Sequence, residues 1–373
     1  MKHPKAKQNI RTGLIAAASC ILSGTMLLTL LHTNANPSSL KLSDTSEAFE
    51  QTVNNLLTTE LGGNAQNIHY TRSLLDSDLI APEPDPNCFG KAASPSEMAP
   101  ILEIAANTLH ITSPLFTVNT PIKEGTDIQY YLDDTIFAIT WKQSVKNCTY
   151  TFSEVKIAHP SQFRRFFSEG KYNSGILHTT TEMAASVNAV AASSGDYYSY
   201  RPFGIVVNEG MVHRANGQLL DTCYIDQNGD LLFTYAREID GKTEVQSYVD
   251  ENKVRFSVSF GPVLLVNGVN MVPFFYNSGE IAAQYPRAAL CQMGALHYVV
   301  VSANQEAPDY ILPTVNEFAE NLAELGIPTA YALDGGQTAS IVFNNQLINT
   351  VSYGAQREIS DIIYFATAAG AEQ

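Results

Sequence analysis

The sequence predicts an α+β protein, a strand-rich mixed domain with a few helices, preceded by a membrane-spanning helix and a linker. Two observations predict the domain: segments rich in β-branched and aromatic residues dominate from residue 128 onward, and capped amphipathic segments are few. A third observation, an uncharged run at residues 12–31, predicts the membrane helix. With 373 residues, 45% of them hydrophobic, the chain can bury a large core and is not wholly disordered.

The amino terminus has the pattern of a signal anchor. Basic residues are concentrated in its first eleven positions: Lys2, Lys5, Lys7 and Arg11. Residues 12–31 are long enough to span a bilayer as a helix, and the positive flank keeps residues 1–11 in the cytoplasm. We therefore expect the rest of the chain outside the cytoplasm. The alternative is a signal peptide cleaved near residues 32–35, which gives a secreted product.

The body of the chain is strongly acidic. Acidic residues outnumber basic ones 37 to 22, and without the four basic residues of the amino terminus the balance is 37 to 18, a net charge of −19. Such a charge repels polyanions at long range and argues against binding to nucleic acid or adhesion to an anionic surface. An anionic substrate therefore needs a local basic pocket.

Residues 32–100 are predicted to be a stalk or linker. They begin rich in Asn, Ser and Thr, and near their end three prolines at alternate positions stiffen the chain toward an extended form. Compact structure is expected from Ile101 onward. It divides into an amino-terminal strand region at 101–148 that packs on a main domain at 149–370.

Local patterns predict the elements of these regions. β-branched and aromatic residues predict strands at 128–141 and 149–157. The segment His159-Pro160-Ser161 is expected to open a short helix that carries the three phenylalanines after it.

Two further helices have complete start signals. Thr179 with Glu182 forms a capping box, and so does Thr314 with Glu317. The second helix ends at a glycine and a proline, and the strand YALD follows it at once.

Several hairpins are expected among the remaining strands. Asn-Gly turns at 228–229 and 267–268 are strong hairpin signals. A weak recurrence joins three segments: GIVVNEGMV from Gly204, PVLLVNGVN from Pro262 and SIVFNNQLI from Ser340. It is either an internal repeat or the common appearance of hairpins.

The cysteines leave two alternatives open. Those outside the membrane segment are Cys88, Cys148, Cys223 and Cys291. In an exported chain they can form two disulfides, in any of three pairings, and the alternative is a set of buried free thiols. No C-x-x-C or H-E-x-x-H motif occurs, so no metal is expected, and no cofactor motif is present.

Two loops carry the candidate chemistry. The first, SSGDYYSYR at 193–201, combines a carboxylate, three tyrosines and an arginine. Tyrosine faces suit a sugar ring, and the arginine fork suits a phosphate or carboxylate. The second, DGGQT at 334–338, follows a strand, and its consecutive glycines let the backbone approach a ligand and turn amides toward an anion. The alternative for each loop is a tight turn capped by Asp.

The order of four motifs resembles the phosphodiester glycosidase family. They are NAVAASSGDYYSYRPFGIVVNEG, SFGPVLLVNG, PRAALCQMGALHYVVV, and AYALDGGQTASIVFNNQLIN after the Thr314 helix. The resemblance covers roughly 149–366. The chain departs from the family pattern at Ser194 and Ala332, where the family usually has Asn, and at 337–339, where it has a glycine and two serines.

The resemblance implies hydrolysis, outside the cytoplasm, of the bond between a sugar anomeric carbon and a phosphodiester oxygen. By position it implies Asp334 and Asp196 as the catalytic carboxylates, with acid and base roles left open. The expected substrate-binding residues, from the resemblance and the two loops together, are Arg201, Arg287, Tyr197, Tyr198, Gly335, Gly336, Gln337 and Thr338.

Two functions follow as expectations. The first is an anchored extracytoplasmic glycosidase that acts on a sugar-1-phosphodiester, such as one in a wall or capsular polymer. The second is a catalytically silent glycan-binding or polysaccharide-assembly protein of the same fold, which the departures from the family pattern favour. The expected partners are a glycan or sugar phosphodiester and, through the amino-terminal helix, a membrane; the oligomeric state is not indicated.

Overall fold

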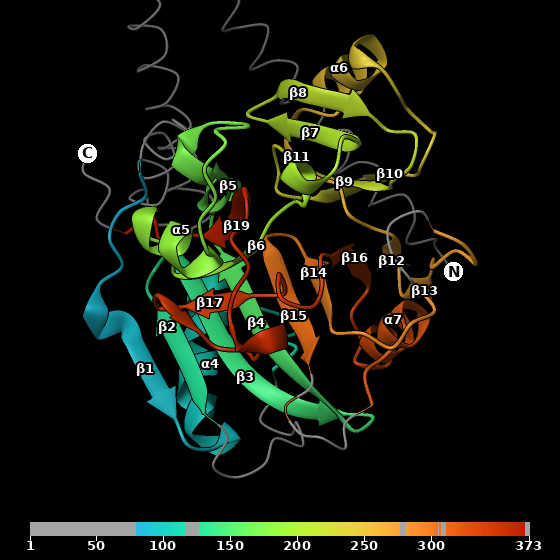
Figure 1. The fold of residues 1–373 in the computed structure, drawn as a ribbon. Coiled ribbons are helices and arrows are strands. Elements are labelled where there is room, and N and C mark those ends of the chain that lie inside the picture. The colour runs from blue at the N-terminus through green and yellow to red at the C-terminus, as the bar shows by residue number, and fades with distance from the viewer. Residues whose placement is uncertain (1–79, 117–126, 277–280, 305, 307–310, 370–373) are drawn as a thin grey trace, which may run out of the picture. The chain divides into compact units, whose positions relative to one another are not determined.

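Three antiparallel sheets and four α-helices make up the part of the chain that the computed structural model describes, namely residues 80–116, 127–276, 281–304, 306 and 311–369 (Figure 1). These residues all belong to one compact unit, 69–373. Strands dominate and helices are few, as the predicted α+β class requires. The predicted membrane helix and most of the predicted stalk lie outside the described residues.

The largest sheet has nine strands in the order β1-β2-β3-β4-β15-β14-β16-β12-β13. Their bounds are β1 Phe89–Ala92, β2 Ile128–Leu132, β3 Ile136–Val145, β4 Cys148–Ile157, β12 Val263–Val266, β13 Val269–Asn270, β14 Arg287–Gly294, β15 His297–Asn304 and β16 Thr329–Leu333. One face packs against α4 (Pro95–Leu109) and α7 (Val315–Glu324), in a core that includes Trp141, Phe152 and Phe318.

The other face of the nine-stranded sheet packs on two five-stranded sheets. Their orders are β10-β9-β11-β7-β8 and β18-β17-β6-β19-β5. Their bounds are β5 Phe163–Phe167, β6 Ala191–Ser194, β7 Gly204–Asn208, β8 Met211–Asn216, β9 Thr222–Asp226, β10 Leu231–Thr234, β11 Val254–Val258, β17 Ile341–Phe343, β18 Gln346–Leu347 and β19 Asp361–Phe365. The helix α6 (Lys242–Glu251) covers the first of them, and α5 (Thr180–Ser186) covers the second (Figure 1).

Local signals predicted several elements correctly. Thr179 and Thr314 cap α5 and α7, each in a capping box with the glutamate three residues later. The Asn-Gly turns join β9 to β10 and β12 to β13. The three recurrent segments are all hairpins, but each belongs to a different sheet.

Three predicted boundaries were wrong. The segment 128–141 holds two strands, because Asp133 Oδ1 accepts the amides of Thr135 and Ile136 and turns the chain between them. The helix expected after His159 is a single 3-10 turn, and its phenylalanines lie in β5 because β5 pairs with β19. The predicted linker ends before residue 100, since β1 pairs with β2 and α4 already begins at Pro95.

The described residues also bear on three further expectations. Cys88, Cys148, Cys223 and Cys291 are free thiols, three of them buried and Cys88 half-buried. No helix within the described ranges is long and apolar enough to cross a membrane. The same ranges contain no group of three or more His, Cys, Asp or Glu side chains that could hold a metal ion.

Candidate active site

Strand pairing brings the two predicted loops to one place. The Asp334 loop connects β16 to β17, and β17 pairs with β6, whose end leads into the Asp196 loop. The Ser194 amide donates to the Ser340 carbonyl at 3.3 Å, where the two loops leave the sheet. Loops that are far apart in sequence therefore lie side by side at the same end of two paired strands in a five-stranded sheet.

A third segment, residues 351–360 before β19, completes the site. The Arg357 amide donates to the Gln337 carbonyl at 3.3 Å, which holds this segment along the Asp334 loop. The guanidinium Nη1 of Arg357 lies 3.9 Å from Asp334 Oδ2 and donates to Tyr197 Oη at 3.2 Å. Arg357 thus bridges the two loops, although sequence reasoning had not selected it.

Asp334 has the properties of a reactive carboxylate. Its side chain is 15% exposed, and its Oδ2 is buried without a hydrogen-bond partner among the described atoms. Burial raises the pKa of Asp334, while Thr338, Arg357 and Arg201 oppose the rise. A carboxylate with open lone pairs and a raised pKa, placed beside cations, can serve as a base or a nucleophile.

Aromatic rings and arginines line the other side of the site. Tyr197 and Tyr200 stack with their ring centroids 4.6 Å apart, and the Arg357 guanidinium lies 5.7 and 5.6 Å from the two centroids. The Arg201 guanidinium lies 4.9 Å from the ring of Phe260 and 5.3 Å from that of Tyr197. Flat ring faces beside two guanidinium forks suit a sugar carrying a phosphate.

Asp196 does not reach this surface. Its side chain is fully buried, with Oδ2 accepting the Ser259 amide at 3.0 Å and Oδ1 lying 3.9 Å from Arg201 Nη2. Asp196 was predicted to be a second carboxylate at the substrate. In the structure it is a buried residue that contacts the Arg201 guanidinium. Asp196 is drawn inward by Arg165. This arginine lies on β5, in the same sheet as β6, and its Nη2 is 3.7 Å from Asp196 Oδ2.

We call the buried group of Arg165, Asp196 and Asp361 the Arg165 cluster. Arg165 Nε donates to Asp361 Oδ2 at 2.7 Å, and its Nη2 lies 3.7 Å from Asp196 Oδ2. Asp361 also accepts the Asp196 amide, so the first residue of β19 fixes the start of the Asp196 loop. All three side chains are 0% exposed.

The Arg165 cluster predicts a pH dependence of stability. Burial, reinforced by the Asp196 charge and opposed by Arg165, raises the pKa of Asp361 to about 7 from the usual 3.8. Between these values the folded state holds a proton that the unfolded chain has released. The free energy of unfolding should therefore fall as pH rises from about 4 to about 7, by at most ~1.4 kcal/mol per pH unit.

Urea unfolding at a series of pH values measures this slope, and Asp361→Asn is the control because it removes the titrating group. The slope should be smaller in Asp361→Asn than in the unchanged protein. Equal slopes in the two proteins would show that Asp361 does not titrate in this range.

The predicted substrate contact of Tyr198 also differs from expectation. Tyr198 is buried against Phe167 and Tyr172, because the 3-10 turn 198–200 directs it away from Tyr197. It is therefore a core residue and not a substrate-binding one.

The glycines of the Asp334 loop serve close packing. A side chain on Gly335 would come within 2.0 Å of the Pro286 carbonyl oxygen, and Gly336 has a φ of +63° and donates its amide to the same oxygen at 3.2 Å. The Gly336 amide is thus engaged, and it does not face an anion as predicted. The next residues, Gln337 and Thr338, are half-buried and buried.

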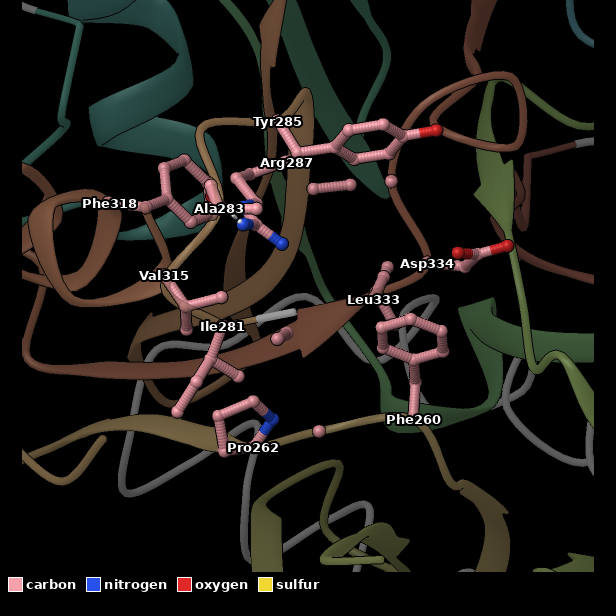
Figure 2. Close-up of a pocket in the computed structure, with 14 residues that line it drawn as sticks. Phe260, Pro262, Ile281, Ala283, Tyr285, Arg287, Val315, Phe318, Leu333 and Asp334 are labelled. Atoms are coloured by element: carbon pink, nitrogen blue, oxygen red, sulfur yellow. Dashed lines mark hydrogen bonds between the residues drawn. The ribbon is translucent and has the colours of Figure 1, made fainter. Parts of the chain in front are cut away.

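A pocket of about 290 Å³ opens beside Asp334 (Figure 2). Phe260 and Leu333 line the pocket next to the Asp334 carboxylate, and Tyr285 and Arg287 line its opposite side (Figure 2). The predicted residue Arg287 therefore shares a pocket with Asp334, while Arg201 and Tyr197 are absent from its lining and contact the ring of Phe260. Burial lowers the pKa of Arg287 to about 10, which leaves the guanidinium charged at neutral pH.

Fold and site together define an α+β protein with one carboxylate set among guanidinium groups and aromatic rings. Residues 187–366 match the family model described as phosphodiester glycosidase, so the chain resembles that family over this stretch. The sequence resemblance is thereby confirmed. Comparison with curated proteins gives no match.

One solved structure shows a related fold. The zebrafish N-acetylglucosamine-1-phosphodiester α-N-acetylglucosaminidase catalytic domain, described as auto-inhibited by its pro-peptide, aligns with a TM-score of 0.51 and 15% identity over 75% of this chain and 88% of that one. At this identity the likeness concerns the fold. A hypothetical protein from Synechocystis aligns with a TM-score of 0.45 and 12% identity, over 66% of this chain and 64% of that one. A putative exported protein from Burkholderia pseudomallei aligns at 0.40 and 13%, over 59% and 74%.

Proposed function

We propose that this protein hydrolyses the bond between the anomeric carbon of a sugar and a phosphodiester oxygen, with Asp334 as the catalytic carboxylate. The observation that supports this best is the position of Asp334. Its buried Oδ2 accepts no hydrogen bond from the described residues and lies 3.9 Å from Arg357, beside the Tyr197–Tyr200 stack. This places a carboxylate, a cation and flat ring faces at one surface, as a sugar phosphodiester requires. The family of residues 187–366 supports the same reaction class.

The chemistry needs few groups because a phosphate leaves without being protonated. The demanding steps are the stabilisation of an oxocarbenium-like centre and the activation of water. Asp334 serves these steps, either as the base for water or as the nucleophile. Arg287, which lines the same pocket, stabilises the leaving phosphate, and the positive charges of Arg201 and Arg357 around the site assist it. Asp196 acts indirectly by holding Arg201.

The second candidate function is a catalytically silent protein that binds a glycan or assists polysaccharide assembly. The burial of Asp196 favours it, because Asp334 is then the sole acidic side chain among the described residues that line the pocket. Incubation of the full chain with a panel of sugar-1-phosphodiesters separates the two. Release of free sugar supports hydrolysis, and binding of the panel without turnover supports the silent protein.

Arg357 offers a test of how the phosphodiester is bound. Replacing Arg357 with alanine should raise KM about tenfold with a smaller change in kcat, because the substrate loses a charge-assisted contact of about 1.5 kcal/mol. Steady-state kinetics measure both constants. Arg357→Lys should recover part of the loss because it keeps the charge, and Lys171→Ala, at an exposed site, should leave both constants unchanged.

A KM that stays at the wild-type value in Arg357→Ala would assign Arg357 to the support of the loops alone.

We further propose that the protein is anchored in a membrane by residues 12–31 with its body outside the cytoplasm. The length of the apolar run and its basic flank support this topology. Intact-mass analysis of the native protein should give the full-length chain. A mass that begins near Asn36 would indicate a cleaved signal peptide and a secreted product.

A further inference from the structure

The pocket beside Asp334 has an unusual composition for a sugar-binding site. Of its fourteen lining residues, three carry side chains that can form hydrogen bonds: Tyr285, Arg287 and Asp334. The others are apolar or glycine: Phe260, Gly261, Pro262, Ile281, Ala283, Ala288, Val315, Phe318, Ala332, Leu333 and Gly335.

The hydroxyl groups of a sugar ring would find few hydrogen-bond partners inside this pocket. Each ring hydroxyl needs a hydrogen-bond partner when it leaves water, and a buried hydroxyl without one costs affinity. The side of the site formed by Tyr197, Tyr200 and Arg357 has what a sugar needs, namely ring faces and polar groups. The sugar therefore fits that side, and the pocket fits a group without hydroxyls.

The polar groups of the pocket are arranged in order along it. Figure 2 shows Asp334 at one end, the guanidinium of Arg287 nearer the middle, and Ile281 and Val315 at the other end. Arg287 is held by donating to the carbonyls of Ala283 and Pro313. A phosphate beside Arg287 thus has Asp334 on one side. On its other side is an apolar wall formed by Ile281 and Val315.

We propose that this wall binds the alcohol of the phosphodiester, and that the substrates are sugar-1-phosphodiesters of hydrophobic alcohols. The assignment rests on the proposed function, which places the anomeric carbon at Asp334. Over the whole reaction, the bond from the anomeric carbon to the phosphate oxygen breaks and a water oxygen forms a bond to that carbon. The products are the free sugar and an alkyl phosphate, and the proton released by water passes to the carboxylate and then to solvent.

Binding of two phosphate monoesters tests the wall without any turnover. Calorimetry with the full chain should show butyl phosphate binding about fiftyfold more tightly than methyl phosphate if all three of its extra methylenes are removed from water. Ile281→Asn, which places an amide on the wall, should abolish the preference. Ile104→Asn, an exposed position on α4 outside the pocket, should retain it.

A second variant tests the same wall independently, in case Ile281→Asn does not fold. Ala283→Phe fills the same space with an apolar group, so it should also abolish the preference, and thermal unfolding of each variant reports on its fold. Equal affinities of the unchanged protein for butyl and methyl phosphate would overturn the proposal.

Hydrolysis then locates the apolar group in the substrate. The n-propyl and glyceryl diesters of one sugar 1-phosphate have the same carbon skeleton and differ by two hydroxyls. We expect kcat/KM to be about tenfold higher for the propyl diester. Equal values for the two diesters would overturn the assignment of the wall to the alcohol, while the proposed function would stand. If neither diester is cleaved but butyl phosphate binds preferentially, the hydrolytic function fails and the apolar ligand class stands.

Discussion

Replacing Asp334 with asparagine is expected to lower kcat about a thousandfold or more and to leave the fold intact. Asparagine keeps the shape of the side chain but can neither accept the proton of water nor attack the anomeric carbon. The Arg357 contact is with Oδ2 at 3.9 Å, so little stability depends on the charge. Free sugar released from a sugar-1-phosphodiester measures kcat, and thermal unfolding measures the fold.

The pH profile adds a second readout to the same variant. Because the reactive form of Asp334 is ionised, kcat/KM of the unchanged protein should fall as the pH drops through its raised pKa. Asp250→Asn, at an exposed position on α6, is the matched control and should keep normal activity and the normal profile. Near-normal turnover in Asp334→Asn would show that the catalytic carboxylate lies elsewhere.

The largest effect on stability is expected from Arg165→Ala. This change leaves Asp196 and Asp361 buried without their shared cation and also removes the donors to the carbonyls of Val207 and Ser257. Breaking a buried ion pair from one side costs about 3–5 kcal/mol. Urea unfolding at neutral pH should show a loss of this size.

The exposed change Lys171→Ala should alter the free energy of unfolding by less than about 0.5 kcal/mol. Asp361→Asn added to Arg165→Ala should restore part of the loss, because one of the two unpaired carboxylates is then gone. A loss below about 1 kcal/mol in Arg165→Ala would mean that the two carboxylates are satisfied without Arg165.

Those parts of the site that depend on residues close together in the chain could be predicted from the sequence. Asp334 was recognisable because consecutive glycines follow it at the end of an apolar strand, and Tyr197 and Arg201 because aromatic and basic residues crowd one short loop. Capping boxes and Asn-Gly turns are equally local, and the structure has the corresponding helices and hairpins. Such features involve contacts within a few residues and can be predicted without knowledge of the fold.

What escaped prediction depends on contacts between distant segments. Arg357 has no local motif, and it reaches Asp334 because the segment before β19 runs along the Asp334 loop. The burial of Asp196 could not be foreseen, because the arginine that holds it lies on β5, which had been expected to be helical. Tyr197 and Tyr198 are adjacent in sequence but face opposite sides, since a 3-10 turn begins between them.

The strand order sets a limit on how this protein can be divided. The family match begins at residue 187, yet β4 pairs along the whole of β15, and β5 pairs along the whole of β19. A fragment cut at the family boundary would expose the edges of two buried strands and would lose Arg165 along with β5. Bare edges of this kind invite association between chains. The stretch that defines the family is therefore not an autonomous folding unit, and the segment before it contributes scaffold to the site from outside the matched boundary.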